Sequence, residues 1–224
     1  MSFALKSLFD YKFVEIEKKQ ECTVIGNSGI LLHRNYKGYI EGTNGYVVRC
    51  NDAPLIPSTT NRNEIRVVVH SAVSKMSEHH FKNCKYCVVW FPKDQLSNVQ
   101  GGMRKFQKSN PNTIFLQLTD SFLHQIYHFY TQLTGIPKIQ GIWVSTGFIA
   151  FTLAHLYSLE KVNLMGFGAF APSHDKAPWH YYGSPTTKDQ KELLKSHKNH
   201  YFMSEAKGIA NFAKQFPDKI NIFP

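Results

Sequence analysis

The chain has 224 residues, of which 42% are hydrophobic and 19% charged, with 26 Lys and Arg against 16 Asp and Glu. This length and the absence of a long block of like charge exclude an intrinsically disordered protein and allow a substantial core. The formal charge of +10 favours an anionic partner: nucleic acid, an acidic membrane surface or a phosphorylated small molecule. Because the basic residues are scattered and no nucleic-acid-binding signature is present, nucleic acid is not the predicted partner.

The first 20 residues contain short apolar groups broken by Lys6, Asp10 and Lys12. They lack the apolar core of a signal peptide and the ~18 residues of a membrane-spanning helix. We therefore expect a soluble, single domain over residues 1–224 with an amphipathic segment at 1–20. The predicted form of that segment is a helix packed on the protein's own core, and contact with a membrane surface is the alternative. Its apolar residues are Phe3, Leu5, Leu8, Phe9 and Phe13.

Four cysteines leave the redox compartment open. Cys84-Lys-Tyr-Cys87 has the spacing of a redox motif or of half a zinc site, but no second pair completes a metal site. Cys87 also opens an apolar run. We therefore expect strand-borne thiols, reduced in the cytosol, and no bound metal.

Strands and helices alternate along the chain. Seven short runs rich in β-branched and aromatic residues predict strands at residues 22–26, 45–50, 65–73, 86–91, 113–118, 161–168 and 219–223. Helical spacing is found at residues 120–135, 146–160 and 187–216. Most of the strand runs are continuously apolar, as strands covered on both faces are. The pattern predicts an α/β fold with a mainly parallel sheet flanked by helices, whose ligands bind beyond the carboxyl ends of the strands.

Three turns of small residues follow strand-like runs of the sequence. They are Gly26-Asn27-Ser28-Gly29, Ser145-Thr146-Gly147 and Gly166-Phe167-Gly168. Glycines let backbone N–H groups approach a ligand, and Ser or Thr hydroxyls bind phosphate oxygens or cap a helix. The first turn is not a phosphate loop, a dinucleotide fingerprint or a nucleophile elbow, because the glycine spacing differs from each. A further polar pair, Asn51 and Asp52, ends the run at 45–50 and could also form a simple turn before Pro54.

The C-terminal part supplies candidate catalytic groups. His180 stands between Trp179 and Tyr181, and His200 is followed by Glu205 in a His-x4-Glu arrangement. On one helix these two residues would be roughly one and a half turns apart, so Glu205 need not bind His200. We expect Glu205 to hold the nearby backbone or to reach a sugar. A histidine of this kind, taken alone, is also compatible with a structural role.

Together these residues give the chain a resemblance to the eukaryotic-type sialyltransferase family, whose members use CMP-sialic acid. The family's large motif begins Cys-x-Val-Val-Gly-Asn-Ser-Gly and ends near Arg-x-Asn-x-Ala-Pro, and residues 22–54 match both ends. Its small motif pairs Ser-Thr-Gly with Gly-Phe-Gly, as residues 145–168 do. The third motif matches His180-Tyr181-Tyr182, and the very small motif matches His200 and Glu205. All four occur in the family's order.

The resemblance implies a single-domain, Rossmann-like catalytic fold, a variant of the GT-A type, and an inverting transfer that needs neither cofactor nor metal. It implies His200 as the general base on the acceptor hydroxyl and His180 as donor to the departing phosphate. A neutral imidazole suits the first role because its pKa lies near 7. Absence of an Asp-x-Asp sequence fits a CMP leaving group, which has no diphosphate for a metal to bridge. The implied substrate-binding residues are Asn27, Ser28, Asn51, Ser145, Thr146, Gly147, Gly166, Phe167, Gly168, Trp179, Tyr181 and Glu205.

Several features depart from the family pattern. The family's inter-motif disulfide would join the positions of Cys22 and Leu159, so that bridge cannot form, and Gly183 replaces a commonly acidic residue. No membrane anchor is apparent, so we expect a cytoplasmic or soluble protein, or a lumenal Golgi one if the chain is trimmed. Expected partners are a nucleotide-sugar donor and a galactose-type glycan acceptor. Alternatives are another CMP-linked acidic sugar such as Kdo, a related bacterial family with a similar turn, and a non-catalytic CMP-sugar or glycan binder. Acceptor, linkage and oligomeric state are not determined by the sequence.

Overall fold

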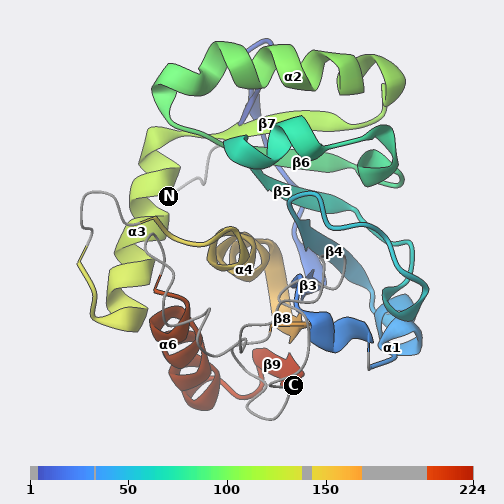
Figure 1. Cartoon of the computed structure of the whole chain (residues 1–224). Helices are drawn as coiled ribbons and strands as arrows, with labels where there is room; N and C mark the ends of the chain where they lie inside the picture. The colour runs from blue at the N-terminus through green and yellow to red at the C-terminus, as the bar shows by residue number, and fades with distance from the viewer. Residues whose placement is uncertain (1–4, 33, 138–142, 168–200, 224) are drawn as a thin grey trace, which may run out of the picture.

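A computed structural model describes residues 5–32, 34–137, 143–167 and 201–223. Its centre is a nine-stranded sheet in the order β2-β1-β7-β6-β5-β4-β3-β8-β9 (Figure 1). All pairs from β7 to β9 are parallel, while β1 is antiparallel to both β7 and β2. The strands are β1 (Leu5–Ser7), β2 (Phe13–Val14), β3 (Lys19–Ile25), β4 (Gly45–Cys50), β5 (Ile65–Val69), β6 (Tyr86–Trp90), β7 (Ile114–Leu118), β8 (Ser158–Met165) and β9 (Ile220–Phe223).

Helices cover both faces of the sheet, giving three layers (Figure 1). One face packs against α3 (Asp120–Thr134), α4 (Thr146–Tyr157) and α6 (Phe202–Gln215). The other packs against α1 (Lys37–Gly42) and α2 (Leu96–Ser109). Successive strand residues point to opposite faces, so Val67 joins the core beneath α4 and Val68 the core beneath α2. This double coverage explains why the strand sequences are continuously apolar.

The strand order reverses at β3. From β3 the chain adds β4, β5, β6 and β7 in one direction, and then returns through α3 and α4 to place β8 on the other side of β3. The turns that follow β3 and β8 therefore lie side by side at the carboxyl edge of the sheet. Parallel sheets bind ligands at such a reversal, because the two following connections diverge to opposite faces and leave a crevice.

The structure confirms the predicted α/β fold, and each of the seven predicted strand runs contains a strand. The predicted strand at 65–73 is shorter than expected, since the chain turns into a 3-10 helix at His70–Lys75. The described part of the predicted helix at 187–216 starts at Phe202. Helix α2 was not among the predicted helices.

The predicted N-terminal helix is wrong. Residues 5–7 and 13–14 form the strands β1 and β2, and β1 pairs with β7 at the edge of the parallel sheet. Main-chain hydrogen bonds to β7 and burial of Leu5 and Leu8 on the sheet outweigh the helical spacing of the apolar residues. Within the described ranges, no helix has the length and apolarity needed to cross a membrane.

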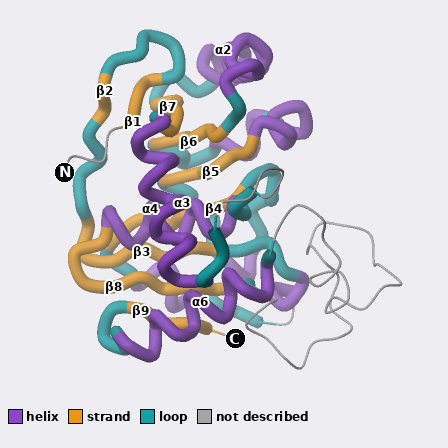
Figure 2. The backbone as a smooth tube through the Cα atoms, turned by 90° about the vertical axis from the view of Figure 1, so that its left-hand side faces the viewer, coloured by secondary structure: helices purple, strands orange, loops and turns teal. Residues whose placement is uncertain are grey.

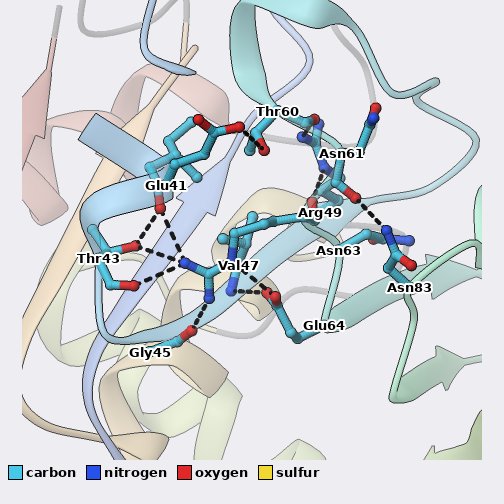
Figure 3. Close-up of polar contacts among 12 residues, drawn as sticks. Glu41, Thr43, Gly45, Val47, Arg49, Thr60, Asn61, Asn63, Glu64 and Asn83 are labelled. Atoms are coloured by element: carbon cyan, nitrogen blue, oxygen red, sulfur yellow. Dashed lines mark hydrogen bonds and ion pairs between the residues drawn. The ribbon is translucent and has the colours of Figure 1, made fainter. Parts of the chain in front are cut away.

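A network of arginine hydrogen bonds fixes the loop between β4 and β5 (Figure 3). The buried Arg49 donates to the carbonyls of Thr59, Thr60 and Arg62, each at 2.9 Å. Arg62 in turn donates to three carbonyls that surround the C-terminus of α1 and the start of β4, namely Ile40, Thr43 and Gly45. Its Nε also pairs with Glu64 Oε1 at 2.9 Å. These contacts hold the β4–β5 connection against α1, on the face opposite α4.

Arg49→Met should lower the free energy of unfolding by about 2–4 kcal/mol, because it leaves three loop carbonyls without their buried donor. Urea denaturation followed by circular dichroism measures this change. The matched control is Arg34→Met at an exposed position, where we expect a change within about 0.5 kcal/mol. Equal stability of the two variants would contradict the structural role of Arg49.

Candidate functional site

The turns after β3 and β8 meet at the point where the strand order reverses. Gly26 N–H donates to the Met165 carbonyl at 2.8 Å, and Ser28 N–H donates to the Gly166 carbonyl at 3.0 Å. A Cβ on Gly26 would overlap the Gly166 carbonyl, and a Cβ on Gly166 would lie 2.6 Å from the Leu31 side chain. Gly166 also has a φ of 68°, which glycine adopts without strain. Both glycines are therefore required by the close approach of the two turns.

The N-terminus of α4 faces this pair of turns. Ser145 is its N-cap, and the Ser145 hydroxyl accepts from Phe148 N–H at 3.0 Å. The Phe167 ring lies between Gly26 and Gly147. A Cβ on Gly147 would lie 2.9 Å from the Phe167 Cε1, and a Cβ on Gly26 would lie 3.1 Å from the Phe167 Cγ. First-turn N–H groups have no partner within a helix and attract anions. The N–H groups of Thr146 and Gly147 at the start of α4 are thus suited to bind a phosphate group.

Asn51 connects the end of β4 to α4 and β5. Its φ of 50° is left-handed, which turns the chain sharply after the strand. The side-chain Nδ2 donates to Thr146 Oγ1 at 3.3 Å, and Oδ1 accepts from Val69 N–H at 3.0 Å. Asn51 thereby fixes the position of Thr146 at the helix N-terminus.

Asn27 and Ser28 occupy the turn itself. Asn27 Nδ2 donates to the Cys50 carbonyl at 3.4 Å, so the side chain reaches across the end of β4. The buried Ser28 hydroxyl accepts from Ile30 N–H at 3.4 Å and supports the 3-10 turn Gly29–Leu32. Both residues follow β3, and Asn27 reaches the end of the neighbouring strand β4, where Cys50 precedes Asn51.

Glu205 is a buried carboxylate on α6 that binds the N-cap of α4. Its Oε1 accepts from Ser145 N–H at 2.9 Å and its Oε2 accepts from the Ser145 hydroxyl at 2.5 Å, although the residues are 60 positions apart. Only 4% of Glu205 is exposed. Burial raises the pKa of Glu205 to about 7, and the two hydrogen bonds from Ser145 oppose the rise. The sequence expectation that Glu205 holds backbone fits the contact with Ser145 N–H.

The structure thus brings together the predicted residues from three of the four motifs. In one place lie Asn27, Ser28, Asn51, Ser145, Thr146, Gly147, Gly166, Phe167 and Glu205. Predicted residues that lie outside the described part of the chain are Gly168, Trp179, His180, Tyr181 and His200.

The four cysteine thiols are not placed to act as nucleophiles or redox groups. All four are buried and unbridged, and burial raises the pKa of Cys84 to about 12 and that of Cys87 well above its ordinary value. A buried protonated thiol is a poor nucleophile and a poor redox centre. Among the described residues, no three His, Cys, Asp or Glu side chains form a cluster suited to a metal ion.

An aromatic group at the same edge of the sheet was missed from the sequence. Trp143, two residues before Ser145, lies 5.3 Å from the Trp90 ring at the end of β6, and His70 at the end of β5 lies 6.0 Å from Trp90. Trp143 is 37% exposed. A sequence signal did exist for the two tryptophans, since Trp90 lies at the end of the predicted strand 86–91 and Trp143 directly precedes Val144 and the small-residue turn 145–147.

The structure is an α/β protein whose parallel sheet reverses its strand order beside two interlocked glycine turns and a helix N-terminus, which is where such sheets commonly bind ligands. The family model "Glycosyltransferase family 29 (sialyltransferase)" matches residues 3–216. The chain belongs to this family, and the resemblance found in the sequence is confirmed.

Two similar proteins come from mouse and rat. The chain is 26% identical over 179 residues to the mouse CMP-N-acetylneuraminate-beta-galactosamide-alpha-2,3-sialyltransferase 2. The match covers 77% of this chain and 49% of the mouse protein, and the values for the rat protein are the same. The chain therefore spans about half the length of these relatives. A crystal structure of a mammalian sialyltransferase has a TM-score of 0.59 at 21% identity, covering 91% of this chain and 68% of that one. Another, in complex with Gal-beta-1-3GalNAc-ortho-nitrophenol, has a TM-score of 0.57 at 20% identity, covering 91% and 69%. These structural matches confirm the fold.

Glu205→Gln should remove a pH dependence of stability. The folded pKa of about 7 exceeds the ordinary value of 4.5, so the folded state favours the protonated carboxyl, and stability is lost as pH rises through this window. The loss amounts to about 3 kcal/mol by pH 8. Gln keeps an acceptor for Ser145 N–H and a donor for the Ser145 hydroxyl, so the unfolding free energy of the variant should exceed that of the wild type at pH 8 and match it near pH 4.5. Parallel urea titrations from pH 4 to pH 8 measure the difference, and a difference independent of pH would contradict the assignment.

Proposed function

We propose that the protein transfers sialic acid from CMP-sialic acid to a hydroxyl of a terminal galactose-type sugar, with inversion at the anomeric carbon and without a metal ion. The observation that carries this proposal is the meeting of Asn27, Asn51 and Thr146 with the Glu205–Ser145 pair at one end of the sheet. These residues come from three separate motifs of the family.

The donor nucleotide would bind at the carboxyl edge of the sheet, beside the turns after β3 and β8 and the N-terminus of α4. The N–H groups of Thr146 and Gly147 at the start of α4 would bind the phosphate of CMP, since a helix N-terminus favours negative charge. Asn27 and Ser28 would hold the nucleotide beside this phosphate. A phosphate held in this way also stabilises the negative charge that develops as CMP departs. The names of the curated relatives include CMP-N-acetylneuraminate, which supports the choice of donor.

The Glu205–Ser145 pair supports His200 as the general base. Glu205 attaches the first turns of α6 to the N-cap of α4, and His200 precedes Glu205 by five residues in the chain. The base would therefore be tethered near the proposed phosphate site, where it would take the proton of the attacking hydroxyl. His180 would donate a hydrogen bond to the departing phosphate. These hydrogen-bond donors would stabilise the charge of a monophosphate leaving group, so the proposed reaction does not require a metal ion.

Trp143 and Trp90 support a sugar acceptor at the neighbouring strand ends. The partly exposed ring of Trp143 offers an apolar surface two residues before Ser145. Its centroid lies 5.3 Å from the centroid of the Trp90 ring, which packs against it. Sugar sites combine such aromatic surfaces with a few polar groups that fix orientation. The mammalian sialyltransferase crystallised with Gal-beta-1-3GalNAc-ortho-nitrophenol supports a galactose-type acceptor.

Two substitutions separate donor binding from catalysis. Asn27→Ala should weaken CMP binding roughly tenfold by removing a hydrogen bond, whereas His200→Ala should spare CMP binding and lower kcat roughly 10²–10⁴-fold. Calorimetric titration with CMP and release of CMP from CMP-sialic acid in the presence of lactose and EDTA measure the two effects.

Each part of the proposal has an outcome that contradicts it. Full transfer activity of His200→Ala would contradict the assignment of His200 as the general base. Loss of wild-type activity in EDTA would contradict the proposal that the reaction needs no metal ion. Turnover of CMP-Kdo in place of CMP-sialic acid would identify a different donor. CMP binding without turnover of either donor would identify a non-catalytic binder.

Trp143→Ala should raise KM for lactose roughly tenfold and leave KM for CMP-sialic acid unchanged, because the lost surface faces the acceptor side. Trp143→Tyr keeps an aromatic face and should restore most of the affinity. Initial rates with each substrate varied in turn measure both constants. An equal rise in both KM values would place Trp143 outside the acceptor site.

A further inference from the structure

The turn between β1 and β2 packs on α2 at the end of the sheet opposite β9. Gln100 Nε2 on α2 contacts both the Leu8 carbonyl at 2.7 Å and the Tyr11 hydroxyl at 2.8 Å. The Arg104 guanidinium lies 5.6 Å from the centre of the Phe9 ring. Figure 2 shows β2, β1 and α2 at one end of the molecule, with α6 and β9 at the other. The hairpin and helix thus form one surface.

Two aromatic side chains project from this surface. Phe13 is 67% exposed, the largest exposed fraction among the large apolar residues of the described chain, and Tyr11 is 48% exposed. Phe13 pairs with Lys6 across the hairpin, and the Lys6 ammonium lies 4.7 Å from the centre of the Phe13 ring. The core does not use these rings, although they belong to a strand pair that fixes where they lie.

Four exposed or partly exposed basic side chains, Lys6, Lys12, Arg104 and Lys108, lie on the hairpin and on α2. Gln100, Arg104 and Lys108 follow at intervals of four on α2, so they form one row along the helix. From residue 95 to residue 119 the sequence contains three basic residues and no acidic one. Asp10 is the one carboxylate of the hairpin, and it lies 3.9 Å from the Lys12 ammonium. We call the set Lys6, Tyr11, Lys12, Phe13, Arg104 and Lys108 the basic aromatic edge.

We propose that the basic aromatic edge binds an anionic lipid bilayer surface. Phe13 and Tyr11 would enter the boundary between headgroups and acyl chains, where rings with an apolar body and a polar tip are stable. The four cations would lie at the level of anionic headgroups. Single-stranded nucleic acid would need a charged groove lined by stacking rings, whereas these rings stand on an edge hairpin. The edge is separate from the candidate site, so the proposal does not depend on the proposed function.

Vesicle co-sedimentation tests this proposal. The full chain should bind phosphatidylcholine vesicles that contain phosphatidylserine and should not bind vesicles of phosphatidylcholine alone. Arg104→Gln with Lys108→Gln should weaken binding roughly 25-fold, at about fivefold for each cation. Phe13→Ser should weaken it roughly tenfold by removing an inserted ring. The matched controls are Lys207→Gln with Lys214→Gln on α6 and Leu159→Ser on β8, all exposed and distant in the fold.

The controls should bind the anionic vesicles as the wild type does, and all variants should retain the wild-type circular dichroism spectrum. Equal binding to both vesicle types would overturn the proposal. The same holds if the control variants lose as much binding as the edge variants, or if Phe13→Ser has no effect. Binding to a DNA duplex that competes with vesicles and is insensitive to Phe13→Ser would instead assign the basic residues to nucleic acid.

Discussion

The candidate site depends on the close approach of the two glycine turns that follow β3 and β8. Hydrogen bonds from Gly26 and Ser28 to the backbone at Met165 and Gly166 join the ends of β3 and β8, and neither glycine has room for a side chain. The Phe167 ring then lies against both turns and the start of α4. The strand order reverses at the same point, which is where parallel sheets bind ligands. The two glycine turns therefore lie at the centre of the candidate site.

Polar contacts fix the position of the N-terminus of α4 in the candidate site. Asn51 holds Thr146 from β4, and Glu205 holds Ser145 from α6, so the helix N-terminus is bound from two sides. A carboxylate in this setting is costly to ionise, which is why its pKa rises. The Ser145–Glu205 hydrogen bonds join α6, in the C-terminal part of the chain, to the N-terminus of α4.

Much of the fold could be predicted because each parallel strand has a continuously apolar sequence between small-residue turns. The N-terminal prediction failed because the spacing of Leu5, Leu8 and Phe9 suits a helix, whereas the edge of β7 offers unpaired main-chain groups that favour a strand. Helix α2 was missed because Gly101 and Gly102 interrupt its helical propensity, although burial of Val99, Met103 and Phe106 stabilises it. In both cases tertiary contacts outweighed the local preference.

The sequence by itself determined the family, the small-residue turns and the order of the strands along the chain, because these depend on residue types at short spacings. Only the tertiary structure decided which of these residues meet. Ser145 and Glu205 are 60 positions apart, and Trp143 lies against Trp90 from another strand end. Such pairs follow from where the sheet order reverses and which helix covers which face. No local pattern encodes that choice, since it is made by the packing of the whole core.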